Sequence, residues 1–318
     1  MTAYIVRRFL HAVLVIFILS FVIFLVMRLL PGDPILLLVT GDELAQTSEE
    51  KIAQLRHEFG LDKPITVQYV TWLGQFLKGD FGTSIIYRDN VKRELLRRLP
   101  ITLHLGLTAF ILGSLIGLVL GILSATRRGS WIDAFVTLLA NLGVAAPPFW
   151  LAALFIYFFG VHLKILPVSG YTSPISDFWF SLKQAVLPIL CLGVFPICST
   201  ARQTRSSMLE VIHQDYIRTA WAKGLKEGII VTRHALKNAL IPVVTVMGVI
   251  LRYVVGGSVV IEMVFNIPGL GRLAVDSAVA QDYPVVQGII LLVAAIVVTI
   301  NLIVDLLYGW LDPRTRYD

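Results

Sequence analysis

Charged residues are scarce in this sequence, and their scarcity excludes a soluble globular domain. Asp, Glu, Lys and Arg make up 15% of the 318 residues, whereas hydrophobic residues make up 56%. The mean hydropathy is +0.78. Soluble domains carry roughly 25% charged residues, so the composition indicates a polytopic membrane protein. The formal net charge of +6 is explained by basic loops between spans and does not indicate a nucleic-acid partner.

Cysteine is also scarce, which excludes a disulfide scaffold. Cys191 and Cys198 are the two cysteines of the sequence, and both fall in one hydrophobic run. On a helix, residues at this spacing lie about 10 Å apart along the axis, too far for a disulfide. We expect both to be small core residues.

Motifs of catalysis and nucleotide binding are missing. The sequence has no G-x-x-x-x-G-K-[ST] loop, no His-Glu-x-x-His helix, no G-x-S-x-G elbow and no paired-cysteine metal pattern. The six histidines are scattered, and we expect His104 to be a hydrogen-bonded packing residue rather than a ligand. The sequence therefore predicts no enzymatic activity, no metal site and no cofactor bound by this chain.

Long apolar runs are abundant and predict an all-α protein. We expect six membrane spans, at residues 9–30, 101–125, 134–160, 184–200, 239–264 and 286–310. The first run follows Arg7 and Arg8 but is too long for a cleavable signal peptide, so we interpret it as an uncleaved span. Adjacent prolines at 147 and 148 interrupt the third span. Pro147 is expected either to line a transport pathway or only to shape the packing.

The segment 31–99 is too long to be a structureless loop. A capping box, Thr47-Ser-Glu-Glu50, begins a predicted helix that Gly60 ends, and Pro64 begins a second one that ends near Gly79. We expect a small extracytoplasmic helical subdomain inserted after the first span. The whole chain, 1–318, is otherwise one transmembrane domain.

The segment 202–237 is strongly basic. It contains seven Lys or Arg residues against three acidic ones, so the positive-inside rule places it, with both termini, in the cytoplasm. Residues 215–224 predict a short helix, with Asp215 as its N-cap and Gly224 ending it in the left-handed conformation. Its apolar stripe, for which we expect little cover from the same chain, consists of Ile217, Ala220, Trp221 and Leu225.

This short helix has two interpretations. A basic amphipathic helix can lie on the membrane surface. Small residues beside an exposed tryptophan instead suit the docking of a cytoplasmic partner, and we favour this interpretation. The predicted docking residues are Asp215, Ile217, Arg218, Thr219, Ala220, Trp221, Ala222, Lys223 and Gly224.

Ionisable residues inside the predicted spans are few. We count Arg252 near the middle of the fifth span and Asp305 near the inner end of the sixth. A lipid-facing arginine costs about 2.5–3.5 kcal/mol on insertion scales. Arg252 should therefore face a cavity, where it could bind a substrate carboxylate, or form a structural ion pair. Asp305 is expected to have a structural role near the interface, either capping a helix or forming an ion pair.

A run of small residues in the fifth span, Gly256-Gly-Ser258, predicts close helix packing. The candidate residues for a translocation path are Arg252, Gly256, Ser258 and Pro147.

Motifs along nearly the whole chain match those of one family. In chain order they are Arg7-Arg8-Phe9, Pro31-Gly-Asp-Pro34, Gly60-Leu-Asp-Lys-Pro64, Gln68-Tyr69, Gly79-Asp-Phe-Gly82, Arg205-Ser-Ser-Met-Leu-Glu210, Asp215-Tyr-Ile-Arg-Thr-Ala220, Ala222-Lys-Gly-Leu225, His234-Ala-Leu-Lys-Asn-Ala239, Pro268-Gly-Leu-Gly-Arg272, Asp282-Tyr-Pro-Val-Val-Gln287 and Asn301-Leu-Ile-Val-Asp-Leu-Leu-Tyr308. The chain resembles the inner-membrane permease subunits of bacterial ABC importers of the dipeptide/oligopeptide/nickel family, specifically the first permease, which is dipeptide-permease B-like. The family's cytoplasmic Glu-Ala-Ala…Gly motif falls on 218–220 and Gly224, and of it Ala220 and Gly224 match.

The resemblance implies a type I ABC importer permease fold in the bacterial inner membrane. It implies that 202–237 is the coupling loop, whose short helix docks on a cytoplasmic ATPase. The implied partners are a second homologous permease, two cytoplasmic ATPase subunits and an extracytoplasmic substrate-binding protein. ATP and Mg²⁺ would bind to the ATPases, and the two permeases would form the translocation path by alternating access.

Several alternatives stay open at the level of sequence. The same machinery could import dipeptides, longer peptides, glutathione, or nickel and other metal chelates. A self-contained secondary transporter or channel is a rival of another class, disfavoured by the missing intramembrane acidic relay and by the exposed docking helix. A purely structural membrane protein is disfavoured by the interrupted third span and by Arg252.

Overall fold

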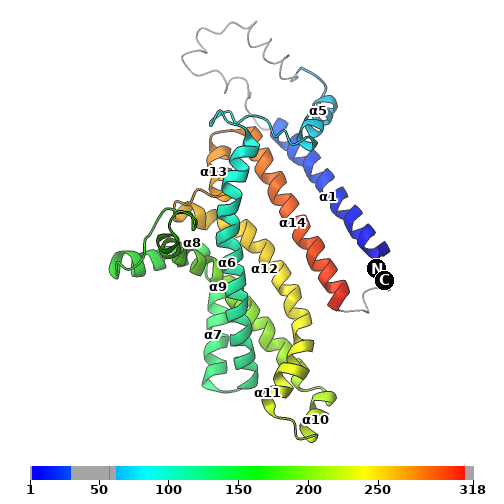
Figure 1. The fold of residues 1–318 in the computed structure, drawn as a ribbon, viewed down its shortest axis with the longest axis vertical. Coiled ribbons are helices and arrows are strands. Elements are labelled where there is room, and N and C mark those ends of the chain that lie inside the picture. Colours follow the sequence, from blue (N-terminus) through cyan, green and yellow to red (C-terminus); the bar gives the residue numbers. More distant parts are fainter. Residues whose placement is uncertain (1, 30–56, 58–61, 312–318) are drawn as a thin grey trace.

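The computed structural model describes residues 2–29, 57 and 62–311, and the elements found in these ranges are helices (Figure 1). They are α1 (Thr2–Leu29), α5 (Ile65–Leu77), α6 (Val91–Thr126), α7 (Trp131–Ala145), α8 (Pro148–Phe155), the π-helical segment η1 (Ile156–His162), α9 (Phe178–Ile212), α10 (Asp215–Ala222), α11 (Glu227–Ile229), the π-helical segment η2 (Ile230–Ala235), α12 (Leu236–Val264), α13 (Leu270–Val279) and α14 (Tyr283–Leu311). The helix predicted at 47–60 and the chain beyond 311 lie outside the described residues, apart from residue 57.

The predicted spans are recovered as helices. In the described ranges, five helices are long and apolar enough to cross a membrane, or up to six if one bent pair counts as a span. The largest difference in length is at α9, which has 35 residues and extends beyond the predicted 184–200 at both ends. Helix α6 is also longer than predicted, because it has 36 residues and begins at Val91 rather than at 101. At 1.5 Å per residue it is about 54 Å long, longer than a hydrocarbon core of about 30 Å. Its first turns therefore extend beyond the bilayer.

The third predicted span is broken rather than kinked. The pair formed by α7 and the α8–η1 segment is bent by 108°, and α8 lies across the direction of α7 (Figure 1). A proline disfavours the helical conformation in the residue before it. Because Pro147 and Pro148 are adjacent, Ala146 and Pro147 are both extended, with ψ of 124° and 134°. Two successive extended residues redirect the chain.

The central helix pair, α6 and α9, packs through a stripe of glycines. A Cβ on Gly117 would lie 2.5 Å from the carbonyl oxygen of Ile197, and one on Gly121 would lie 2.5 Å from Thr204 Cβ. Gly113 belongs to the same stripe. The spacing is the small-xxx-small pattern of close helix contacts. The close packing predicted at Gly256 is wrong, because a Cβ there would meet nothing within 4 Å.

The N-terminal helix α1 packs against α14 and α5. Arg8 pairs with Asp305 of α14 at 3.0 Å, which confirms the pairing predicted for Asp305. The hydroxyls of Ser20 and Tyr69 lie 2.8 Å apart, and the Phe24 ring contacts the ring of Tyr69 edge-on at 5.5 Å between centroids. The predicted helix after Pro64 is confirmed as α5, and its aromatic face is what holds it on α1.

Two smaller predictions about packing residues are also confirmed. Cys191 and Cys198 are free, buried thiols on α9. The His104 ring lies with its Nδ1 3.1 Å from the hydroxyl of Tyr171.

Among the described residues, no cluster of His, Cys, Asp and Glu could hold a metal ion.

Candidate functional site

The short helix α10 lies at one extreme of the molecule, opposite α5 and α13 (Figure 1). Its N-cap is Gln214, with no side-chain cap bond, and Asp215 is the first helical residue. The prediction of Asp215 as N-cap is therefore wrong by one position, although a carboxylate in the first turn still favours the helix dipole. Gly224 has φ of +74°, and its N–H donates to the Trp221 carbonyl at 2.9 Å. The predicted glycine stop is confirmed.

The apolar side of α10 is covered by the same chain, which corrects the expectation of an uncovered stripe. Ile217 is fully buried and Ala220 is 6% exposed. Both pack in a cluster with Met208 of α9, Ile230 of η2 and Ala239 of α12. The chain returns from α10 through α11 and η2, and this return path supplies the cover. The loop therefore has a small core of its own that fixes α10 on the ends of α9 and α12.

The opposite side of α10 is open. Its exposed residues are Asp215, Tyr216, Arg218, Thr219, Trp221, Ala222, Lys223 and Gly224. The Trp221 side chain is 49% exposed, although it was expected on the same stripe as the buried Ile217. Tyr216 is fixed at the edge by Asn238, whose side-chain N–H donates to its hydroxyl at 2.7 Å. We call these residues the α10 face.

Gly224→Ala is expected to loosen the end of α10 without any steric clash. A Cβ at Gly224 would meet nothing within 4 Å, but a left-handed residue with a side chain costs about 1 kcal/mol. Gly228→Ala is the matched control, because Gly228 also has an open Cβ position and lies in α11. Hydrogen exchange of the α10 amides should accelerate about fivefold in Gly224→Ala and not in Gly228→Ala. Equal exchange in both variants would contradict the assigned role of Gly224.

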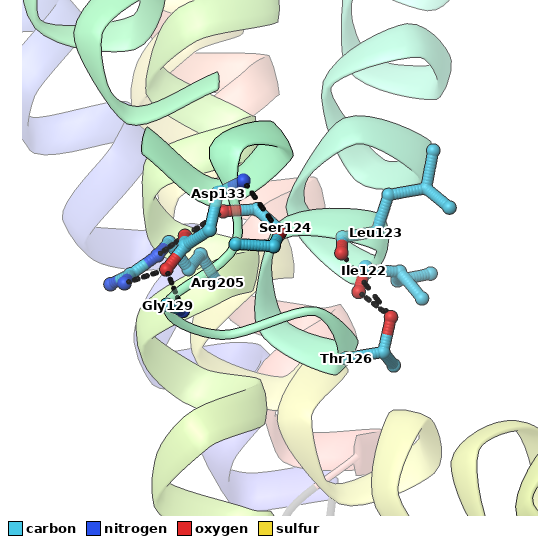
Figure 2. A network of polar contacts seen from close by, with 8 residues as sticks. Ile122, Leu123, Ser124, Thr126, Gly129, Asp133 and Arg205 are labelled. Carbon is cyan, nitrogen blue, oxygen red and sulfur yellow. Dashed lines mark hydrogen bonds and ion pairs between the residues drawn. The ribbon is translucent and has the colours of Figure 1, made fainter. Parts of the chain in front are cut away.

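A buried ion pair fixes the helices that carry α10. Arg205 of α9 forms a bidentate ion pair with Asp133 of α7, in which Nε donates to Oδ1 at 2.6 Å and Nη2 donates to Oδ2 at 2.9 Å (Figure 2). Asp133 also accepts from the Ser124 hydroxyl at 2.5 Å and from the Gly129 N–H at 3.0 Å. Arg205 lies about two turns before the end of α9. The α6–α7 turn is thereby bound to the helix that leads directly into α10.

The four predicted path residues do not line one cleft. Arg252 is half-buried, Gly256 is exposed, Ser258 is buried, and Pro147 is exposed at the break between α7 and α8. Gly256 and Ser258 line an apolar cleft of about 260 Å³ between α6, α12, α13 and α14, which neither Arg252 nor Pro147 lines.

A buried glutamate within the fifth predicted span was missed. Glu262 of α12 is 1% exposed, and it accepts from the Thr102 hydroxyl at 2.7 Å and from the Arg272 N–H at 2.9 Å. The Ser258 hydroxyl also bonds to it. The expectation that Arg252 and Asp305 are the only ionisable residues in the spans is therefore wrong. The lack of an intramembrane acid no longer disfavours a self-contained transporter.

The motif Pro268-Gly-Leu-Gly-Arg272 explains how this carboxylate is accommodated. A Cβ on Gly269 would lie 2.4 Å from Glu262 Cδ, so any side chain at this position would displace the buried carboxylate. Gly269 is the N-cap of α13. In the first turn of that helix the Arg272 N–H donates to the carboxylate at 2.9 Å, and the Leu270 N–H donates to the Thr102 hydroxyl at 2.8 Å. The N-terminal end of a helix favours a negative charge. Two closely spaced glycines, a few residues after an acid in a span, could have indicated this arrangement.

Asp282 holds the loop before α6 on the turn between α13 and α14. It is fully buried and accepts from the Ser84 hydroxyl at 2.5 Å and from the N–H groups of Ile85 and Ile86, each at 3.2 Å. The Asp282-Tyr-Pro motif is thus a structural anchor at the end of the molecule opposite α10.

Comparison with known proteins gives two family matches. Residues 117–317 match the model described as binding-protein-dependent transport system inner membrane component. Residues 1–106 match the N-terminal model of the membrane component of binding-protein-dependent transport systems. Together the two matches extend over nearly the whole chain.

Relatives named as permeases match over their full length. The chain is 44% identical over 318 residues to a Brucella abortus (strain 2308) protein named as a peptide transport system permease, covering 100% of both chains. It is 40% identical over 320 residues to the oligopeptide transport system permease protein AppB of Bacillus subtilis (strain 168), again covering 100% of both. It is 41% identical over 317 residues, with the same coverage, to the glutathione transport system permease protein GsiC of Salmonella typhimurium (strain LT2).

A solved structure agrees on the fold. A chain of the MetNI methionine ABC transporter, in an inward-facing conformation, matches with a TM-score of 0.57 at 24% identity, covering 69% of this chain and 96% of that one. At this identity the likeness establishes the fold alone, that of an ABC importer permease. With two family models and full-length relatives at 40% identity or above, the chain belongs to the family of binding-protein-dependent transport system inner membrane components.

Proposed function

We propose that the chain is the membrane permease subunit of an ATP-driven importer of peptides. The family match and the relatives named for peptide, oligopeptide and glutathione transport support this proposal. Dipeptides, longer peptides and glutathione remain candidate substrates, and nickel or other metal chelates are the alternative cargo of the same machinery. The chain forms the translocation path together with a second homologous permease, and an extracytoplasmic binding protein delivers the solute.

The end of the molecule that carries α10 is proposed to lie in the cytoplasm. The segment 202–237 holds most of its charge as Lys and Arg, as the positive-inside rule requires. The first turns of α1 and the last turns of α14 are then on this same side, consistent with the pairing of Arg8 with Asp305. The loop anchored by Asp282 and the helix α5 then lie outside.

The α10 face is the proposed docking surface for an ATPase subunit, and it carries the argument for an ATP-driven machine. Ile217 and Ala220 are used to hold α10 on its own chain, which leaves the opposite side without cover. An exposed tryptophan beside small residues suits an interface anchor. ATP and Mg²⁺ would be bound by two such ATPase subunits. Closure of the ATPase pair would move α10, and with it α9, α12 and the α6–α7 turn that Arg205 binds.

Ala222→Asp is expected to abolish recovery of the ATPase with the tagged permease. Ala222 is exposed and lies on the side of α10 opposite Ile217 and Ala220, so the new carboxylate meets the partner rather than the loop's own core. Ala220→Asp is a poorer test, because Ala220 is buried in that core. Thr232→Asp is the control, since it adds the same charge at an exposed position of η2.

The measurement is a pull-down from native membrane in mild detergent, with the co-purifying proteins identified. The proposal predicts an ATPase and a second permease with the wild type and with Thr232→Asp, and loss of the ATPase alone with Ala222→Asp. Recovery of the ATPase with Ala222→Asp at the wild-type level would contradict the assignment of the α10 face as the docking surface. A wild-type chain that purifies without an ATPase and without a second permease would contradict the proposed importer function.

The buried Glu262 is the observation that favours a second candidate function, that of a self-contained, proton-driven transporter. A buried carboxylate in a span is a typical proton relay. The bonds of Glu262 to Thr102 and to the Arg272 N–H favour a structural role, because they use the carboxylate to join α12, α6 and α13. The energy source of transport separates the two functions.

A further inference from the structure

Arg252 is a cation inside α12 for which the described part of the chain provides neither a hydrogen bond nor an ion pair. Its side chain is half-buried, in a helix that otherwise consists of apolar and small residues at this depth. Three other arginines of the described helices are at similar burial. Each of them pairs with a carboxylate: Arg98 at 3.1 Å, Arg205 at 2.6 Å and Arg272 at 3.4 Å. A guanidinium placed in a membrane helix without such a partner has to find one in something the chain meets.

The surroundings of Arg252 are open on one side. Val249, Tyr253 and Val260 are 50%, 42% and 42% exposed, and with Gly256 they follow the three- and four-residue spacing of one helix face. Arg252 lies at the edge of this face, one turn from Gly256. A Cβ on Gly256 would meet nothing within 4 Å, so a molecule can approach the helix backbone there.

An aromatic pair gives this face a fixed wall. Tyr253 directly follows Arg252 in the sequence. Its ring packs on Phe195 of α9 with 4.3 Å between centroids, which fixes the ring while the side chain of Tyr253 stays partly exposed. The combination is a planar cation with a fork of donors, a phenol hydroxyl and a stretch of bare backbone. These groups suit a solute that carries a carboxylate and an amide backbone.

We propose that Arg252 binds the carboxylate of the transported solute as the solute passes along the exposed face of α12. The inference rests on the proposed function, because it requires that this face line the translocation path. It deepens that function by naming the solute group that the permease recognises, a free carboxylate such as the C-terminus of a peptide. An acidic side chain of the second permease is the competing partner for Arg252.

The test compares a peptide with its own amide. The importer, assembled with its second permease, ATPases and binding protein, is reconstituted in proteoliposomes, and ATP-driven uptake of alanyl-phenylalanine and alanyl-phenylalanine amide is measured. The variants are Arg252→Gln, which removes the charge, and Arg252→Lys, which keeps it. Because every variant uses the same binding protein, any preference of that protein cancels in the comparison with the wild type.

We expect Arg252→Gln to lower uptake of the free acid about tenfold or more, the size of one lost charge-assisted hydrogen bond, and to leave uptake of the amide nearly unchanged. Arg252→Lys should retain an intermediate preference for the acid. Gly256→Leu should reduce uptake of both peptides while the protein still folds, because the added side chain enters open space.

Three results would overturn the inference. An acid-to-amide ratio that is the same in Arg252→Gln and the wild type would show that Arg252 does not contact the carboxylate. An equal loss of both peptides, together with weakened recovery of the second permease, would assign Arg252 to an ion pair between the permeases. A wild-type importer that takes up neither peptide with ATP would instead overturn the proposed function, and the inference with it.

Discussion

Gly117→Leu is expected to prevent accumulation of folded protein in the membrane. A Cβ at this position would lie 2.5 Å from the Ile197 carbonyl oxygen and 3.1 Å from the Ala201 N–H nitrogen. Both atoms belong to the backbone of α9, so no side-chain rotation can relieve the contact. Leucine can be accommodated only if α6 and α9 separate. Even Gly117→Ala should cost about 1–3 kcal/mol, the usual size of an overpacking defect.

The control for this substitution is Gly74→Ala in α5. A Cβ on Gly74 would meet nothing within 4 Å, and alanine is the better helix former by about 0.5–1 kcal/mol. Membrane abundance and the thermal unfolding midpoint in mild detergent are the measurements. Gly74→Ala should match or exceed the wild type. Wild-type abundance and midpoint in Gly117→Leu would show that α6 and α9 do not pack as described.

Arg205→Met is expected to cost about 3 kcal/mol of folding free energy. Removing one partner of a buried ion pair costs about 3–5 kcal/mol, and the lower end applies because the Arg205 side chain is 29% exposed. Asp133 would stay bonded to Ser124 and Gly129 but would carry an uncompensated charge. Asp133→Asn with Arg205→Met should recover part of the loss, since the double variant buries no charge.

A double-mutant cycle on Asp133 and Arg205 measures the coupling. The detergent unfolding midpoints of the two single variants and the double variant should give an interaction energy of about 2 kcal/mol or more. The control is Arg93→Met, because Arg93 pairs with Asp89 at 2.9 Å but its side chain is 75% exposed, so its loss should cost less than about 1 kcal/mol. Additive effects of the two buried substitutions would contradict the ion pair.

The helices of this protein could be predicted from sequence because each span needs a continuous apolar run. What sequence alone did not give is the direction of the chain between two runs. The prolines at 147 and 148 predicted an interruption, but the bend of 108° depends on both Ala146 and Pro147 being extended. Gly113, Gly117 and Gly121 carried a readable small-xxx-small pattern. It predicts close packing but does not name α9 as the partner.

The candidate docking helix was found from local signals, namely a helical stretch, a glycine stop and a tryptophan. The orientation of this helix could not be predicted, because Ile217 and Ala220 are covered by residues 230–239, which reach α10 only in the folded chain. Local periodicity identifies an apolar stripe but not what covers it. Glu262 was missed for a related reason. Its partner Thr102 lies far away in the sequence and Arg272 lies beyond the span. Ser258, one turn earlier in α12, is the partner that lies near it on the same helix, and one hydroxyl alone does not identify a buried acid.

The measurement that tests the importer most directly is the energy source of uptake. The permease is reconstituted with its second permease, ATPases and binding protein in proteoliposomes, and uptake of a labelled dipeptide is followed with ATP alone and with a proton gradient alone. We predict uptake with ATP that an uncoupler of the proton gradient leaves intact and that Ala222→Asp abolishes. Uptake by the chain without ATPases, driven by the proton gradient and lost in Glu262→Gln, would contradict the account and would establish the self-contained transporter.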